Sequence, residues 1–259
     1  MTSGRYIPLP TGMHVEWAIR AMEKGKHCLI EKPIASSLVS AQRIVKVSSW
    51  RKTSLFENFM FLYHSQHQFI RQQLDAGVIG EIRCFRSAFG FPPLPADNIR
   101  YEKKLGGGVL LDAGVYTLRA AQLILGNRLS VRAAHLKIDP KSGVDIYGGV
   151  FLSGDNGITA QLAFGFDNFY QCNYEIWGSK GKITAERAFT AGPGVTPKVI
   201  IETQGDRQEH ILPEDNHFAN LLKDFHKSIT TGKHDAQHNA IVNQARLLNR
   251  VRTIAGKRK

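Results

Sequence analysis

The first 60 residues alternate short apolar segments with amphipathic ones, and this alternation constrains the fold more than any other feature. Apolar segments of strand length lie at residues 6–9, 27–30 and 54–58, and residues 12–24 and 37–50 carry apolar side chains at helical spacing. Strand and helix segments in this order predict parallel strands joined by right-handed crossovers.

Capping signals support the first of these helices. Thr11 is expected to cap it, and Gly25 is expected to end it.

Beyond residue 60 the alternation gives way to a run of strands. We expect a helix over 65–76, a strand over 82–91, a helix over 109–125, strands over 129–212 and helices over 215–230 and 235–255. Because the strands follow one another with short turns, they indicate an antiparallel sheet. The sequence therefore predicts two domains, an α/β part over 1–60 and an α+β part over 61–259.

Composition and charge exclude several classes of protein. The 259 residues include 34 Lys and Arg against 22 Asp and Glu, and the net charge of +12 favours anionic partners such as sugar nucleotides. The basic residues are scattered and no nucleic-acid module is recognised, so we expect no nucleic-acid partner. No apolar stretch approaches roughly 20 residues and no secretory signal is recognised, which predicts a cytoplasmic protein without a membrane partner.

The three cysteines are widely spaced and odd in number. Cys28, Cys84 and Cys172 suggest neither a zinc site nor a disulfide framework. Cys28 lies in an apolar segment and is expected to be a small core residue.

A lysine follows the second predicted strand directly. Lys32, in Glu31-Lys32-Pro33, would lie on a loop at the carboxyl end of a parallel strand, where α/β proteins bind ligands. Pro33 holds this loop and keeps Lys32 out of helical geometry. A cation placed there can stabilise the charge that develops on a carbonyl oxygen during hydride addition.

The segment 106–116 adds an acid and a phenol after three glycines. Asp112 and Tyr116 are four residues apart on a predicted helix, so they are expected to share a face. The glycines would let a ligand approach backbone N–H groups at a helix N-terminus. A nearby ammonium would lower the pKa of Tyr116 from about 10 and make it a better proton donor. With Lys32, these residues predict reduction of a carbonyl by a nicotinamide cofactor.

Each pattern also has a plainer interpretation. A Glu-Lys-Pro tripeptide occurs by chance, three glycines are often a flexible loop, and Asp and Tyr at this spacing often form a surface hydrogen bond. Their joint occurrence, in this order, favours the catalytic interpretation.

The histidines do not predict a metal site. His64 and His67 have no acidic or cysteine neighbours, so we expect them to contact substrate or lie at the surface. His14 is expected either to touch a ligand at the end of a strand or to cap or pack its helix.

With these residues the chain resembles the glucose-fructose oxidoreductase and inositol dehydrogenase (Gfo/Idh/MocA) family over nearly its whole length. The finer resemblance, to sugar-nucleotide 3-ketoreductases of deoxysugar biosynthesis, is carried by residues 6–10, 57–62, 99–101, 106–116, 144–149, 159–165 and 173–175. The resemblance implies a partial Rossmann domain with a parallel sheet, followed by an α+β domain with an open, mainly antiparallel sheet and helices on one face.

The resemblance also implies roles. Lys32 would lie near the nicotinamide and the reacting carbonyl, Tyr116 would donate the proton, and Asp112 would orient the sugar or Tyr116. The cofactor, NADP or NAD, would be contacted by Leu9, Pro10, His14, Glu31, Lys32, Pro33 and Asn58. The substrate would be contacted by Arg100, Tyr101, Asp112 and Tyr116. NADPH would deliver hydride to carbon 3 of a dTDP-3,4-diketo-2,6-dideoxyhexose, and the product would be a 4-keto sugar with a 3-hydroxyl.

The chain departs from the family pattern at its start. A family member carries further strands ahead of Tyr6 with a Gly-x-Gly-x-x-Gly motif that holds the pyrophosphate, and this motif occurs nowhere in the 259 residues. Three explanations stay open: a truncated or mis-called start, a fragment, or a non-catalytic descendant. We expect NADPH binding to be weakened by orders of magnitude, and the flank of the shortened sheet to recruit partners.

Two other functions are retained as alternatives. The first is a dehydrogenase of a free sugar, polyol or dihydrodiol, and the second is a non-catalytic, oligomerising remnant. The sheet domain is expected to form homo-oligomer contacts through an apolar face.

Overall fold

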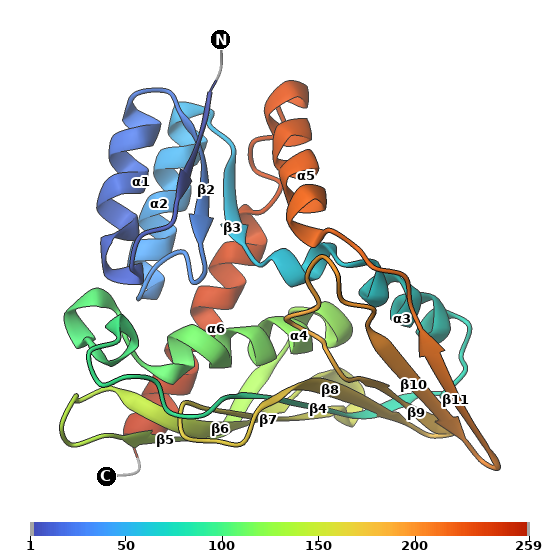
Figure 1. The fold of residues 1–259 in the computed structure, drawn as a ribbon. Helices are drawn as coiled ribbons and strands as arrows, with labels where there is room; N and C mark the ends of the chain where they lie inside the picture. The colour runs from blue at the N-terminus through green and yellow to red at the C-terminus, as the bar shows by residue number, and fades with distance from the viewer. Residues whose placement is uncertain (1–2, 258–259) are drawn as a thin grey trace.

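A computed structural model describes residues 3–257, in which a small parallel sheet stands beside a large mixed sheet (Figure 1). The small sheet and its connecting helices comprise β1 (Gly4–Ile7), α1 (His14–Glu23), β2 (His27–Glu31), α2 (Leu38–Arg51) and β3 (Leu55–Asn58). The three strands pair in the order β1-β2-β3 and run parallel. The predicted alternation of strands and helices is therefore confirmed.

The two helices of this part begin differently. The Ser37 hydroxyl caps α2 by accepting a hydrogen bond of 3.2 Å from the Ser40 N–H. The prediction that Thr11 caps the first helix is wrong, because residues 11–13 form a 3-10 turn ahead of α1. This turn packs tightly against a distant segment, since a Cβ on Gly12 would lie 2.6 Å from the Lys104 carbonyl oxygen.

The large sheet has eight strands in the order β11-β10-β9-β8-β4-β7-β6-β5. Its strands are β4 (Ile82–Gly90), β5 (Ser130–Ile138), β6 (Asp145–Ser153), β7 (Thr159–Gly165), β8 (Gln171–Gly178), β9 (Gly181–Ala185), β10 (Lys198–Thr203) and β11 (Asp206–Ile211). Neighbouring strands are antiparallel except β4 and β7, which pair in parallel from Cys84 beside Thr159 to Gly90 beside Gly165. The sheet is thus mainly antiparallel, as expected, and the parallel pair of β4 and β7 joins strands that are separated by a long stretch of chain.

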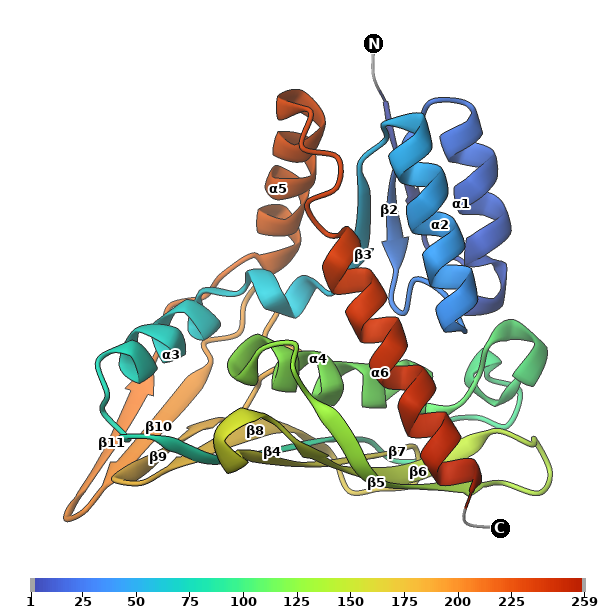
Figure 2. The same cartoon turned by 180° about the vertical axis from the view of Figure 1, so that it is seen from behind.

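The remaining helices are α3 (Ser65–Asp75), α4 (Val115–Leu125), α5 (His217–Thr231) and α6 (His238–Gly256). In Figures 1 and 2, α3, α4 and the end of α6 lie on one face of the large sheet, and no helix of residues 3–257 covers the opposite face. Trp177 and Phe151 are exposed large apolar residues of strands β8 and β6.

The two C-terminal helices also pack against the small sheet. Ile30 of β2 shares an apolar cluster with Ile241 of α6, whereas Leu29 shares another with Phe225 of α5. Because neighbouring strand residues point to opposite faces, α5 and α6 cover the two sides of this sheet. The division at residue 60 stays a prediction.

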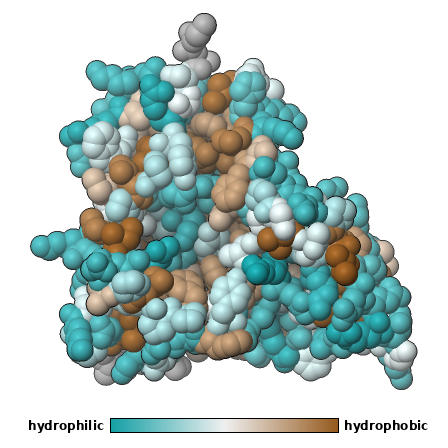
Figure 3. Space-filling model, in the orientation of Figure 1, coloured by the Kyte–Doolittle hydropathy of each residue, from teal (hydrophilic) through white to brown (hydrophobic). Residues whose placement is uncertain are grey.

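One face of the protein is mostly hydrophilic, and a long apolar segment lies in its core. The face shown in Figure 3 is mostly hydrophilic, with apolar side chains in small separate groups. By length and composition residues Lys103–Leu125 could cross a membrane, contrary to the expectation that no such stretch occurs, but 78% of the apolar 18-residue window within this segment is buried inside the protein. It is therefore best understood as a core segment of the large domain.

Candidate active site

The predicted lysine and the glycine-rich segment line one cleft between the two sheets. Its volume is about 170 Å³. On one side lie residues that follow β1 and β2, namely Leu9, Pro10, Thr11, Glu31 and Lys32. On the other side lie Ile99, Arg100, Leu105, Gly106, Gly107, Gly108, Leu111 and Asp112. Lys32 and Asp112, which are 80 residues apart, thus meet at the carboxyl edge of the parallel sheet.

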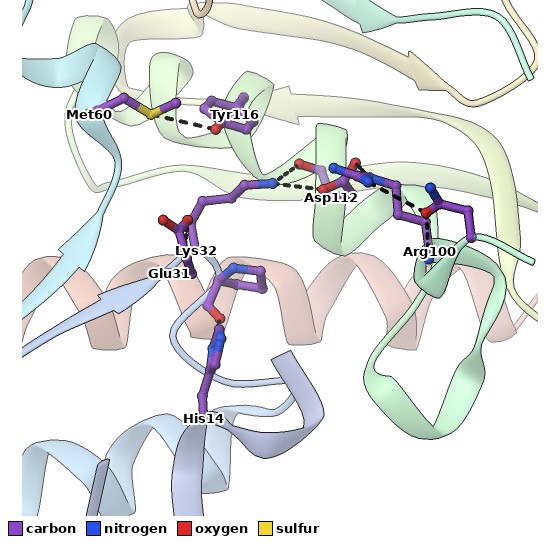
Figure 4. Close-up of polar contacts among 9 residues, drawn as sticks. His14, Glu31, Lys32, Met60, Arg100, Asp112 and Tyr116 are labelled. Carbon is purple, nitrogen blue, oxygen red and sulfur yellow. Dashed lines mark hydrogen bonds and ion pairs between the residues drawn. The ribbon is translucent and has the colours of Figure 1, made fainter. Parts of the chain in front are cut away.

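Asp112 joins two cations at the centre of this cleft (Figure 4). The Lys32 ammonium donates to the Asp112 carboxylate at 2.9 Å and to its backbone carbonyl at 2.6 Å, and the Arg100 guanidinium donates to the other carboxylate oxygen at 2.6 Å. Burial alone would raise the pKa of Asp112, but Lys32 and Arg100 hold it below its usual value. The carboxylate is therefore ionised at neutral pH and holds both cations in place.

Tyr116 lies against Lys32 through its ring, not its hydroxyl. The Lys32 ammonium is 4.7 Å from the ring centroid, and the hydroxyl points to the Met60 sulfur at 3.7 Å. Burial first, and then the charges of Asp112 and Glu31, raise the pKa of Tyr116 well above its ordinary value. The expectation that the neighbouring ammonium would lower this pKa is wrong, because burial has the larger effect.

Aromatic side chains surround the Tyr116 ring. Its centroid lies 5.2–5.7 Å from those of Phe59, Phe61, Phe89 and Phe189. This packing holds the Tyr116 ring in place, and the burial keeps its hydroxyl protonated.

The segment that carries Asp112 forms a wider helical turn than the α-helix that was expected there. Residues Leu110–Gly114 form a π-helical turn that leads into α4, in place of one continuous α-helix over 109–125. Turns of this kind insert an extra residue and often occur at functional sites. The turn directs Asp112 toward Lys32 and Arg100, while Tyr116 remains on α4.

The glycines before this turn are packed against the protein itself. Gly108 has φ of +111°, and a Cβ there would lie 2.4 Å from an Asp145 carboxylate oxygen. The other carboxylate oxygen of Asp145 accepts from the Leu110 N–H at 2.6 Å. Asp145 therefore holds the start of the turn. No role is assigned to it from the sequence, where it is one acid within a strand-like segment.

Three polar side chains meet at the ends of the parallel strands. Asn58 donates to the Glu31 carboxylate at 2.6 Å, and Tyr6 donates to the same oxygen. Burial and the Glu31 carboxylate raise the pKa of Tyr6 to about 12. The sequence singles out Glu31 and Asn58 but gives no signal for the hydroxyl of Tyr6.

His14 joins the loops that follow β1 and β2. One ring nitrogen lies 2.7 Å from the Leu9 carbonyl oxygen and the other 3.0 Å from the Pro33 carbonyl oxygen. Burial lowers its pKa. His14 is therefore a buried, packed residue that connects the loops after β1 and β2, which is one of the two alternatives from the sequence.

Three predicted contacts lie away from this cleft. Tyr101 accepts a hydrogen bond from the Leu94 N–H at 3.2 Å and packs on Phe166, lining a separate pocket. His64 and His67 are buried, so the expectation that they lie at the surface is wrong, and substrate contact stays a prediction. His67 lies 2.8 Å from the Tyr174 hydroxyl.

Within residues 3–257 no group of His, Cys, Asp and Glu is arranged to hold a metal.

The cysteines fit the prediction for the core. Cys28, Cys84 and Cys172 are buried and unpaired with one another. Burial raises the pKa of the Cys28 thiol to about 12, so it is an inert packing group.

Family models match both parts of the chain. Residues 5–59 match an oxidoreductase family with an NAD-binding Rossmann fold, and residues 67–184 match the C-terminal domain of the Gfo/Idh/MocA family.

Individual relatives give the same assignment. A dTDP-3,4-didehydro-2,6-dideoxy-alpha-D-glucose 3-reductase from Actinomadura kijaniata is 41% identical over 96% of this chain and 75% of its own length. A protein of the same name from Saccharopolyspora spinosa is 41% identical over 88% of this chain and 68% of its own length.

Solved structures share the fold. A 3-ketoreductase from Actinomadura kijaniata, in complex with NADP and TDP-benzene, superposes with a TM-score of 0.94 at 41% identity, over 97% of this chain and 78% of that one. An aldose-aldose oxidoreductase from Caulobacter crescentus has a TM-score of 0.90 at 20% identity over 99% of this chain and 78% of that one, which shows the fold alone. The chain belongs to the Gfo/Idh/MocA family of oxidoreductases.

Proposed function

We propose that this protein reduces the C3 keto group of a dTDP-linked 3,4-diketo-2,6-dideoxyhexose with NADPH. The observation that carries the proposal is that Lys32 contacts the Asp112 carboxylate in the cleft and lies 4.7 Å from the centroid of the buried Tyr116 ring, so that groups from both parts of the molecule meet at Lys32. The relatives that are 41% identical are 3-reductases of such a sugar, which supports the substrate class.

The residues at the edge of the parallel sheet fit the nicotinamide end of the cofactor. The Asn58 Oδ1 is buried without a partner, and Glu31 offers carboxylate oxygens, so acceptors are available for amide and hydroxyl groups. Leu9, Pro10 and Thr11 line the same edge. When bound, the cofactor supplies the hydride. The rest of the chemistry belongs to side chains of this chain.

Lys32 and Tyr116 would both act on the ketone oxygen, the first as a cation and the second as a proton donor. The ammonium stabilises negative charge on that oxygen as it develops. Tyr116 remains protonated at neutral pH because its pKa is raised, and its hydroxyl contacts only a weak acceptor, the Met60 sulfur. Its proton is thus available to a strongly basic alkoxide. Asp112 keeps Lys32 beside the ring, as a positioning residue.

The cationic side of the cleft suits a nucleotide diphosphate. The Arg100 side chain is 40% exposed while it contacts Asp112 and Asn98, so it can also be reached from solvent. Lys103 and Lys104 follow in the next turn. With the net charge of +12, these groups favour an anionic sugar nucleotide over a free sugar. We further propose a cytoplasmic homo-oligomer with contacts through the large sheet.

A substrate panel tests the proposal. NADPH oxidation is measured with an enzymatically generated dTDP-linked diketo sugar and with free sugars, polyols and dihydrodiols, at millimolar NADPH. We expect turnover only with the nucleotide-linked sugar, and its loss in Lys32→Ala and Tyr116→Phe. Turnover of free sugars alone would favour the alternative dehydrogenase. No turnover of any compound, together with a stable oligomer, would favour the non-catalytic remnant.

A further inference from the structure

Two neighbouring residues of β3 hold the turn that carries Lys32 from both sides. Asn58 donates to the Glu31 carboxylate at 2.6 Å, just before Lys32. Glu57 accepts from the Ile34 N–H at 2.8 Å, just after Lys32-Pro33. The strand register places Glu57 beside Ile30, so its side chain lies next to the end of β2. The position of Lys32 is therefore fixed by hydrogen bonds to β3.

The burial of Glu57 is not explained by this hydrogen bond alone. Glu57 is 4% exposed, and its second carboxylate oxygen has no partner within the described residues. A buried carboxylate with an unpaired oxygen is expensive, and a glutamine of the same shape could accept the same N–H. What distinguishes the carboxylate is its charge.

Two cations face that charge from different elements. Arg119 of α4 and Lys32 of the turn both interact electrostatically with Glu57. The uncharged amide of Gln237, the residue just before α6, accepts a hydrogen bond from the backbone N–H of Glu57 at 3.0 Å. Arg119 is partly buried, and this burial lowers its pKa while Glu57 raises it. Glu57 thus lies where α4, α6 and the Lys32 turn meet.

We propose that Glu57 is the positioning residue for Lys32: its carboxylate holds the turn through the Ile34 N–H and balances the charge of the ammonium. The inference deepens the proposed reduction and rests on it for its catalytic consequence. The hydrogen bond and the charge balance stand independently of that reaction.

The geometry makes this positioning sensitive to pH. Burial raises the pKa of Glu57 to about 7, against the opposing effects of Arg119, the Ile34 N–H and Lys32. Above this value the ionised carboxylate accepts a charge-assisted hydrogen bond. Below it the Ile34 N–H loses its charged acceptor, and Lys32 loses a balancing charge.

Nuclear magnetic resonance tests the proposal without cofactor or substrate. The backbone amide signals of Lys32 and Ile34 are followed from about pH 5.5 to 8.5. We expect both to shift with one midpoint near pH 7, and the Ile34 proton to move upfield as the pH falls. Glu57→Gln should abolish these shifts. Glu23→Gln, at an exposed glutamate of α1, should leave them unchanged.

Two outcomes overturn the proposal: an Ile34 signal that does not titrate, or one that titrates equally in Glu57→Gln. If Glu57→Gln fails to fold, the wild-type protein decides alone. The carboxyl carbon of Glu57 must then titrate with the midpoint of the Ile34 amide, and separate midpoints contradict the proposal.

Turnover adds a second measurement. We expect Glu57→Gln to lower kcat at pH 8 by about tenfold or more with little change in KM, because a misplaced Lys32 weakens stabilisation of the developing charge. An unchanged kcat would refute the catalytic consequence. If the wild-type protein has no turnover, the proposed reduction fails, and the titration of Ile34 still decides the role of Glu57.

Discussion

The Tyr116 hydroxyl is the group whose removal should separate chemistry from folding. It contacts only the Met60 sulfur at 3.7 Å, so Tyr116→Phe removes little structural interaction. We expect kcat to fall by about 10²–10⁴-fold, the range of a general acid, with KM and the unfolding midpoint in urea nearly unchanged. Tyr147→Phe, at an exposed tyrosine, is the control and should keep full turnover. Retained turnover in Tyr116→Phe would remove Tyr116 from the mechanism.

Asp112 should stabilise the fold in a pH-dependent way. Asp112→Asn leaves one side-chain acceptor oxygen for two cations, so either Lys32 or Arg100 loses its carboxylate contact. Breaking a fully buried pair costs about 3–5 kcal/mol, and we expect a smaller loss here because the pair is partly exposed. The measurement is the free energy of unfolding in urea.

The pH dependence follows from the lowered pKa of Asp112. The stabilisation is complete above the unfolded pKa of about 4 and is lost as the pH falls through the lower folded value. The advantage of wild type over Asp112→Asn should be constant from about pH 5 to 7 and shrink below pH 4. An advantage that persists unchanged in acid would contradict the ion-pair assignment.

The turn that begins at Gly108 depends on the absence of a side chain. Gly108→Ala combines a positive φ with a contact of 2.4 Å to Asp145, whereas Gly77→Ala has a positive φ of +70° and open space. We expect Gly77→Ala to lower the free energy of unfolding by about 1 kcal/mol. Gly108→Ala should lower it by about 1–3 kcal/mol more, since Asp145 must move. Equal losses would show that the contact does not constrain the turn.

The local elements could be predicted from the sequence because their signals are local. The alternation in residues 4–58 matches β1 to β3, and the helix expected over 37–50 is found as α2 at Leu38–Arg51. The π-helical turn at Leu110–Gly114 could not be predicted, because it depends on Asp145, which is 35 residues from Leu110 and holds its N–H.

The site was predicted in its composition but not in its contacts. The loop position of Lys32 and the spacing of Asp112 and Tyr116 were visible in the sequence, and these residues do converge. The orientation of the Tyr116 hydroxyl and the raised pKa depend on four phenylalanines from distant segments. The partner of Glu57, the Ile34 N–H, likewise follows only from the pairing of β2 and β3.

At the level of the whole molecule, the uncovered face of the large sheet should join subunits. A shallow hollow of about 710 Å³ lies there, lined by residues that include Arg86, Gln161 and Glu175. The Arg86 guanidinium lies 5.1 Å from the centroid of the Trp177 ring, which is 50% exposed. We expect Trp177→Glu to yield monomers in sedimentation analysis. Trp50→Glu, on the outer surface of α2, should not change the assembly, and a wild-type monomer would contradict the prediction.

The fate of the transferred hydrogen tests whether the two halves of the cleft act together on one ketone. The protein is incubated with the dTDP-linked diketo sugar and millimolar NADPH that is deuterated at the reactive carbon of the nicotinamide. The product is then analysed by mass spectrometry and proton NMR. We expect deuterium at carbon 3 of a product with a 3-hydroxyl, and none in the product of the double variant Lys32→Ala, Tyr116→Phe. Deuterium at another carbon, or equal transfer by the double variant, would contradict it.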